Sequence, residues 1–205
     1  MTAQHSSRRQ KQAAATRQDI LAAARRLFAD KGYMATSMSA IAAEAETAIQ
    51  TIYDSVGPKH AIILALVGTI EEEAGVEEFR QRIGQARAPR EAIALFVSLT
   101  RRFAERSGDV FVTMMTTAPI EPDVAEAWRQ ANQGHRMGAS FVAQLLANLG
   151  ALKPDIPIER AADMIGVMTF GTTWQQLTRE YGWSLDACER WLNETLVTLL
   201  LRDTT

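Results

Sequence analysis

The fold of the N-terminal part is decided by residues 37–58, SMSAIAAEAETAIQTIYDSVGP. Ser37 can cap a short helix, because the apolar residues of 38–45 recur at i, i+3, i+4 and i+7, the spacing of one helical face. A tight connection around Glu46 leads to a second short helix that ends near Ser55, before a Gly-Pro pair. Two short helices joined by a tight turn are a helix-turn-helix.

A longer helix is expected before this pair. Thr16 and Asp19 have the spacing of a capping box, and the apolar residues of 20–28 then recur on one helical face. Gly32 stands where a left-handed residue ends a helix. The three helices predict a small head whose second short helix fits the major groove of DNA, which is about 12 Å wide.

The rest of the chain is also expected to be helical, which makes the protein all-α, with a head and a larger helical body. Proline and glycine clusters separate the helical patterns, and no segment alternates as a half-buried β-strand does. The expected helices cover residues 58–83, 89–106, 109–116, 122–149, 158–181 and 184–202.

The composition is that of a globular protein, since 47% of the 205 residues are apolar and 22% are charged. Cys188 is the only cysteine, which excludes an internal disulfide and a zinc site built from cysteines. The longest apolar runs are far shorter than the roughly 18 residues that cross a bilayer, and no apolar segment follows the basic N-terminus as in a signal peptide. We therefore expect a cytoplasmic protein that does not enter a membrane.

Charge is unevenly distributed along the chain. Residues 1–60 carry eight Lys or Arg against five Asp or Glu, whereas the remaining residues carry 14 against 19. A basic head on an acidic body is typical of a DNA-binding protein, and a merely solvated basic tail explains the same charges. Charge alone leaves both interpretations open.

The head resembles a known family at specific positions, which lie within about residues 15–65. The pattern resembles the head of the tetracycline-repressor (TetR) family of transcriptional regulators. The matching residues are Arg17, Ile20, Leu21, Ala23, Ala24, Leu27, Phe28, Gly32, Tyr33, Thr36, Ser37, Ile41, Ala42, Ala45, Thr51, Ile52, Tyr53 and Lys59.

The resemblance implies a homodimeric repressor that a small molecule releases from DNA. Residues 1–60 would form the helix-turn-helix DNA-binding domain, of which residues 1–14 are expected to be a flexible basic arm. Residues 61–205 would form a helical ligand-binding and dimerisation domain.

Three positions depart from the family pattern, one of them near Ser55, where the family frequently has histidine, and the other two at the turn. Glu46 stands in the turn where the family usually has glycine, and Ala48 stands where the recognition helix often starts with Ser or Thr. A residue with a side chain is strained at positive φ or forces a different turn, and Glu46 adds a negative charge near the DNA phosphates. Both departures at the turn favour weaker DNA binding, so the alternative function is that of a helical protein that binds or sequesters a small molecule.

The second short helix supplies the expected base contacts. Its spacing places Ile52 toward the core of the head, so that the three residues before it face outward. Gln50 can hydrogen-bond a base edge, adenine best, and Ile49 or the methyl of Thr51 can touch a thymine methyl. By resemblance, contacts to phosphates are expected from Thr36, Ser37, Tyr53 and Lys59.

The body is expected to hold a mostly apolar cavity for a small hydrophobic effector. Methionine and aromatic side chains line adaptable pockets, although plain core packing explains each of them as well. The candidate ligand-binding residues are Phe96, Phe103, Met115, Trp128, His135, Phe141, Met168 and Trp174.

The last two expected helices are the candidate dimer interface. Glycines in the first permit close helix approach, and an apolar row follows in the second, so the two helices could form a four-helix bundle between two copies. The same row can instead cover the core of its own protomer. The candidate interface residues are Gly171, Trp191, Leu192, Leu196 and Leu199.

No catalytic or cofactor motif is found in the sequence. It lacks G-x-S-x-G, a P-loop, a dinucleotide-type glycine loop and H-E-x-x-H, and its three histidines have no partners at ligand spacing. We therefore expect no enzymatic activity, no cofactor and no metal. The expected partners are a palindromic double-stranded DNA operator, the effector and a second copy of the chain.

Overall fold

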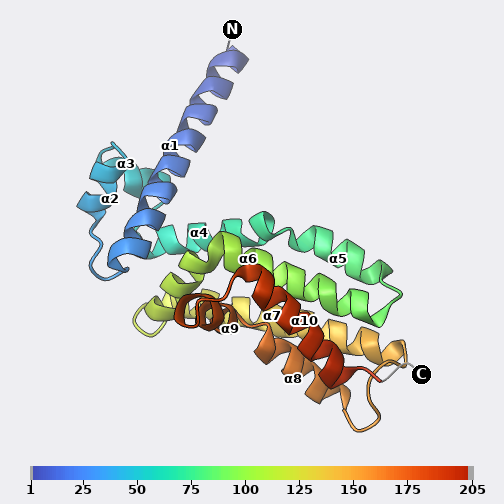
Figure 1. The fold of residues 1–205 in the computed structure, drawn as a ribbon. Coiled ribbons are helices and arrows are strands. Elements are labelled where there is room, and N and C mark those ends of the chain that lie inside the picture. The colour runs from blue at the N-terminus through green and yellow to red at the C-terminus, as the bar shows by residue number, and fades with distance from the viewer. Residues whose placement is uncertain (1, 203–205) are drawn as a thin grey trace. The chain divides into compact units, whose positions relative to one another are not determined.

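The computed structural model describes residues 2–202, and of residues 2–7 and 70–73 it describes the backbone alone. Over this range the regular elements are helices, which confirms the all-α prediction, and one isolated antiparallel bridge joins Leu152 to Leu201 (Figure 1). The elements are α1 (Thr2–Lys31), α2 (Met38–Glu44), α3 (Ile49–Ser55), α4 (Lys59–Ala74), α5 (Val76–Gln85), α6 (Pro89–Thr117), α7 (Pro122–Asn148), α8 (Ile158–Met168), α9 (Gly171–Gln175), the π-helix η1 (Gln176–Glu180) and α10 (Leu185–Leu200).

The first helix is longer than the sequence pattern indicates. Because α1 begins at Thr2, Thr16 lies inside a helix and does not cap one. The residues expected to form an arm continue α1 from Thr2 onward. Its end is as predicted, since Gly32 follows Lys31 with a left-handed φ of 79°.

Three boundaries in the body differ from the predicted ones. The helix expected over residues 58–83 is broken at Gly75, which has a φ of 72°. The two helices expected within residues 89–116 are one helix, α6, with a kink at Ser107 (φ −136°, ψ 15°). The helix expected over 158–181 is interrupted before α9, where Phe170 is extended. Apolar periodicity marks helical segments but does not say whether two neighbouring segments continue along one axis.

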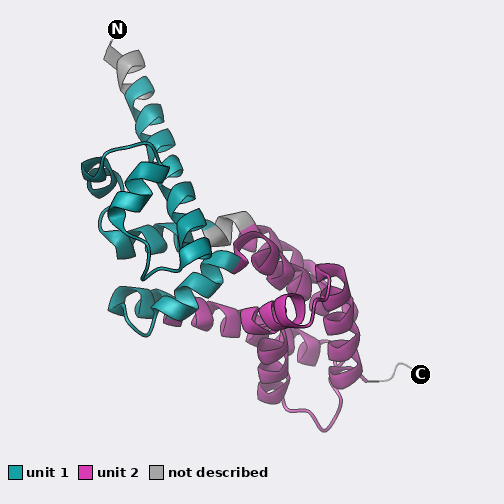
Figure 2. Ribbon diagram, turned by 60° about the vertical axis from the view of Figure 1, so that its left-hand side comes forward, with its two compact units in different colours: residues 1–69, 109–128 teal, residues 70–108, 129–205 magenta. Residues whose placement is uncertain are grey.

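The chain divides into two compact units (Figure 2). The first comprises residues 1–69 and 109–128, so the predicted head is joined there by the end of α6 and the start of α7. Helices α1, α2 and α3 pack against one another. Their buried apolar side chains form the core of the head: Ile20, Ala23, Ala24, Phe28, Ile41, Ala42 and Ile52.

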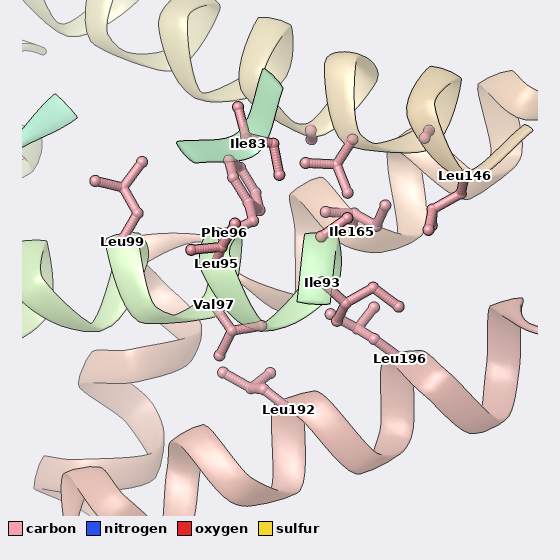
Figure 3. Close-up of a cluster of buried hydrophobic side chains, with 14 of the residues drawn as sticks. Ile83, Ile93, Leu95, Phe96, Val97, Leu99, Leu146, Ile165, Leu192 and Leu196 are labelled. Carbon is pink, nitrogen blue, oxygen red and sulfur yellow. The ribbon is translucent and has the colours of Figure 1, made fainter. Parts of the chain in front are cut away.

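The second unit comprises residues 70–108 and 129–205. Its core gathers aliphatic and aromatic side chains from α5, α6, α7, α8 and α10 (Figure 3). Leu192 and Leu196 of α10 are fully buried there, in the same cluster as Phe96 of α6 and Ile165 of α8. The final helix therefore covers the core of its own protomer with these two leucines.

Candidate nucleic-acid interface and ligand site

The turn between α2 and α3 is closed by its own backbone. Ser37 caps α2 as predicted, accepting a hydrogen bond from the backbone N–H of Ala40 at 3.1 Å. At the other end, the N–H of Thr47 donates to the carbonyl of Ala42 at 2.9 Å, and the N–H of Glu46 donates to that of Ala43 at 3.3 Å. This is a Schellman motif, which requires a left-handed residue at its centre.

Glu46 is that left-handed residue, with a φ of 51°. We expect Glu46→Gly to stabilise the head by about 0.5–1 kcal/mol, because the relief of a left-handed side chain exceeds the added entropy of the unfolded chain. The measurement is the urea midpoint of each variant. Ala45→Gly is the control, since Ala45 has an ordinary φ of −88° and should lose stability. Equal destabilisation by both changes would contradict strain at Glu46.

Helix α3 presents a polar and aromatic outer face. Ile52 is fully buried, whereas Ile49 and Tyr53 are 41% and 48% exposed. Gln50 and Asp54 are exposed as well, and the Nε2 of Gln50 donates to Oδ1 of Asp54 at 2.9 Å. The predicted inward and outward residues therefore lie as expected, except that Thr51 is half-buried. Asp54 was missed, although its i, i+4 spacing from Gln50 was visible in the sequence.

Of the side chains predicted to contact phosphates, some are exposed and others already form hydrogen bonds within the head. Ser37 and Tyr53 are exposed. Thr36 is only 2% exposed, and its hydroxyl donates to the carbonyl of Gly32 at 2.9 Å, so its side chain is engaged at the end of α1. Lys59 is half-buried, with Nζ donating to the carbonyl of Thr36 at 2.7 Å and lying 4.1 Å from the centre of the Tyr33 ring. Burial lowers the pKa of Lys59.

Polar contacts tie the head to the remainder of the first unit. The Nε and Nη2 of Arg25 donate to the two carboxylate oxygens of Asp109 at 2.6 and 2.7 Å. The hydroxyl of Tyr33 donates to Glu121 at 2.9 Å. Burial alone would raise the pKa of Asp109, but the hydrogen bonds and charge of Arg25 outweigh it and hold that pKa below its usual value. Arg25 and Asp109 are therefore a charge-assisted bidentate pair, the strong kind.

We expect Asp109→Asn to destabilise the protein by about 1–3 kcal/mol at pH 7, because the half-buried guanidinium of Arg25 loses its counter-charge. The pKa of Asp109 is lower in the folded state than in the unfolded state. The pair therefore contributes fully to the free energy of unfolding above the unfolded-state pKa, which is about 4. This contribution is lost as the pH falls through the folded-state pKa. Urea unfolding from pH 7 to pH 3 should show the two proteins converging in acid.

The matched control for this prediction is Glu44→Gln. Arg26 and Glu44 also form an ion pair, at 2.9 Å, but their side chains are 61% and 43% exposed. Exposed pairs contribute less than about 1 kcal/mol. If the two variants lose the same free energy of unfolding, the pair of Arg25 and Asp109 contributes no more than an exposed pair.

The predicted ligand-binding residues are not gathered around one described cavity. Phe96 and Trp174 are 3% and 1% exposed in the core of the second unit, whereas Phe141 is 51% exposed. Phe103 and Met168 are partly buried against that core. Met115 and Trp128 belong to the first unit, where the Trp128 ring lies 5.1 Å from that of Phe111.

A groove of about 550 Å³ lies between α7, α8 and α9 in the second unit. His135 is the predicted ligand residue that lines it. Its Nε2 pairs with the carbonyl of Gly166 at 2.9 Å, and burial lowers its pKa, so the ring is neutral at pH 7 with Nε2 as the donor. The lining is more polar than the predicted apolar cavity: Asn132, His135, Arg136, Ser140, Glu159, Ala162, Asp163, Gly166, Val167, Phe170, Thr172 and Thr173.

Near the kink of α6, buried polar atoms of α6 and α9 lack hydrogen-bond partners in the described part of the chain. Among the buried side-chain atoms of the described residues, Oγ of Ser107, Nε1 of Trp174 and Oε1 of Gln175 have no hydrogen-bond partner. The Nε2 of Gln175 donates to the carbonyl of Gly108 at 3.2 Å, which places α9 beside the kink. A Cβ on Gly108 would lie only 2.6 Å from that Nε2, so a side chain there would displace the Gln175 amide. Buried polar atoms of this kind call for a water or a ligand.

The predicted dimer residues on α10 differ in exposure. Trp191 and Leu199 are 37% and 39% exposed, and the Trp191 ring packs edge-on against Trp183 at 5.9 Å. Leu192 and Leu196 are fully buried in the protomer and offer no surface to a partner, which corrects their assignment to an interface. Gly171 begins α9 and is half-buried.

Comparison with known proteins agrees with the geometry of the head. The sequence profile described as "Bacterial regulatory proteins, tetR family" matches residues 20–66, which contain the end of α1 and the whole helix-turn-helix. The head is therefore similar to that of the tetR family of bacterial regulatory proteins. The HTH-type transcriptional regulator UidR of Escherichia coli K12 is 28% identical over 166 residues, which are 79% of this chain and 82% of UidR.

Solved structures share the fold of this chain over nearly its whole length. A transcriptional regulator from Saccharomonospora viridis, in complex with choline, has a TM-score of 0.75 at 20% identity, covering 92% of this chain and 99% of the other. NalD of Pseudomonas aeruginosa, the secondary repressor of the MexAB-OprM multidrug efflux pump, has a TM-score of 0.75 at 20% identity, covering 93% and 100%. Within the part of the chain that the structure describes, no helix is long and apolar enough to span a membrane.

Proposed function

We propose that this protein is a cytoplasmic repressor of the TetR family, which binds a palindromic DNA operator as a homodimer and releases it when a small effector binds. The observation that carries this proposal is the outer face of α3, where Gln50 is exposed and Ile49 and Tyr53 are 41% and 48% exposed while Ile52 holds the helix to the core. Large apolar and amide side chains facing outward from a short, well-packed helix suit base edges in a major groove.

We assign residues 1–60 to DNA binding and residues 61–205 to ligand binding and dimerisation. Regulation of this kind needs no catalytic activity and no cofactor. The dimer would form on the outer face of α10, where Trp191 and Leu199 are exposed. A two-fold dimer presents two copies of α3, so the half-sites of the operator should lie roughly 34–36 Å apart on one face of the duplex.

The effector is proposed to be amphipathic. Its polar group would pair with the unpaired atoms of Ser107, Trp174 and Gln175, and its apolar part would lie against core side chains such as Phe103 and Met168. The regulator from Saccharomonospora viridis, which shares the fold, is in complex with a small molecule, choline. A neutral polar group fits these three uncharged partners better than an ion does.

A second candidate function is that of a small-molecule-binding protein with little affinity for DNA. Two exposed carboxylates favour it, because Glu46 in the turn and Asp54 on α3 both lie where phosphates would approach. A gel-shift titration with the DNA that flanks the protein's own gene separates the two functions. Binding that resists a large excess of scrambled duplex supports the repressor, whereas equal and weak binding of both duplexes supports the alternative.

A further inference from the structure

Gln50 and Asp54 occupy the outermost position on α3. Successive residues of an α-helix are about 100° apart, so a residue two before or two after Ile52 lies about 160° away from it. Ile52 is fully buried against the head, and Gln50 and Asp54 are exposed. Tyr53, which is also exposed, lies on the flank of this face. If α3 enters a groove with the side opposite its packed side, Gln50 and Asp54 go in first.

The hydrogen bond between these two side chains determines which atoms face outward. An ionised carboxylate only accepts hydrogen bonds, so the amide atom at 2.9 Å from Oδ1 of Asp54 is Nε2 of Gln50, and the amide orientation is settled by chemistry. One N–H of Gln50 is thereby used. Its Oε1 remains free to accept, and so does Oδ2 of Asp54. The outer face of α3 therefore presents two acceptors beside one remaining donor.

We propose, on the basis of the DNA-binding function above, that Asp54 is a specificity-determining residue that makes α3 select exocyclic amino groups in the major groove. Adenine N6 and cytosine N4 donate hydrogen bonds there, whereas guanine O6 and thymine O4 accept them. A carboxylate facing O6 or O4 is repelled and left without a partner. Asp54, with Oε1 of Gln50 beside it, thus favours adenine or cytosine on the contacted strand and rejects guanine and thymine.

The same carboxylate weakens binding to every sequence, because it approaches the phosphates with the wrong charge. Asp54 therefore lowers the affinity for DNA of any sequence and raises the selectivity among bases. Glu46 is the matched comparison within the head. It is also exposed and negatively charged, and it lies in the preceding turn rather than on α3, so it repels phosphates without facing a base.

The test is selection from a library of random-sequence duplexes with the wild-type protein, Asp54→Asn and Glu46→Gln. The asparagine amide both donates and accepts, so Asp54→Asn should bind most duplexes more tightly and accept guanine or thymine at one position per half-site. The preference for adenine or cytosine there should fall from about 5- to 150-fold to less than about threefold. Glu46→Gln should also raise affinity but keep the wild-type preferences.

A second measurement removes only the amino group. Purine in place of the selected adenine, or 2-pyrimidinone in place of the selected cytosine, should weaken the wild-type protein about 5-fold or more and leave Asp54→Asn nearly unchanged. Identical selected sequences for wild type and Asp54→Asn would overturn the role of Asp54 while leaving DNA binding intact. A wild-type protein that enriches no sequence and binds no duplex at low salt would instead overturn the proposed function itself.

Discussion

Replacing Leu196 by glutamate is expected to unfold the second unit, whereas the same change at Leu199, three residues later in α10, should leave the protomer folded. Leu196 is fully buried, so the new carboxylate would lie in an apolar core without a partner. We expect a loss of more than about 4 kcal/mol, a large share of the roughly 5–15 kcal/mol that stabilises a typical protein. Loss of far-UV circular dichroism at 25 °C is the measurement.

Leu199→Glu is the comparison variant for Leu196→Glu. Leu199 is 39% exposed, so a charge there remains hydrated in the monomer and should change its stability by no more than about 0.5 kcal/mol. Inside a dimer interface the same charge would be buried without a partner, so analytical ultracentrifugation should show monomers. Trp191→Glu should act in the same way. If both variants remain dimeric, the dimer does not use this face of α10.

Gln50→Ala is expected to weaken binding to the selected operator by about 2–6 kcal/mol per dimer, because each of two half-sites loses about 1–3 kcal/mol of base recognition. Binding to a scrambled duplex should barely change, since a base contact contributes to one sequence only. Fluorescence anisotropy with both duplexes at several salt concentrations measures this. Equal weakening on both duplexes would place the base-reading face elsewhere on the head.

Lys59→Ala should behave differently from Gln50→Ala. Its loss of affinity should be similar for all sequences, and the slope of log affinity against log salt should fall by about one unit per phosphate contact removed. Lys59 also hydrogen-bonds the carbonyl of Thr36 and packs on Tyr33, so the melting temperature of the variant must be compared first. A stable variant with unchanged salt dependence would show that Lys59 serves only to hold the head together.

The sequence by itself determined several local features of the head, although not where α1 begins. Ser37 caps α2, Gly32 ends α1 and Ile52 is the buried residue of α3, as the pattern predicts. Each of these features depends on residues within one or two helical turns, because a cap, a Schellman motif and an amphipathic period are local patterns of hydrogen bonding and side-chain spacing. The exposed side of α3, opposite Ile52, follows from the same arithmetic.

Only the tertiary structure decided which residues of the body face inward. The apolar row of α10 contains Leu196, which is buried in its own protomer, and Leu199, which is not, and the sequence pattern of the row is the same in either role. The pairing of Arg25 with Asp109 joins residues 84 positions apart, and the kink at Ser107 lies beside a glutamine from α9. An apolar helix face can be buried by any element that packs against it. The local spacing of apolar residues does not indicate which distant segment that element is.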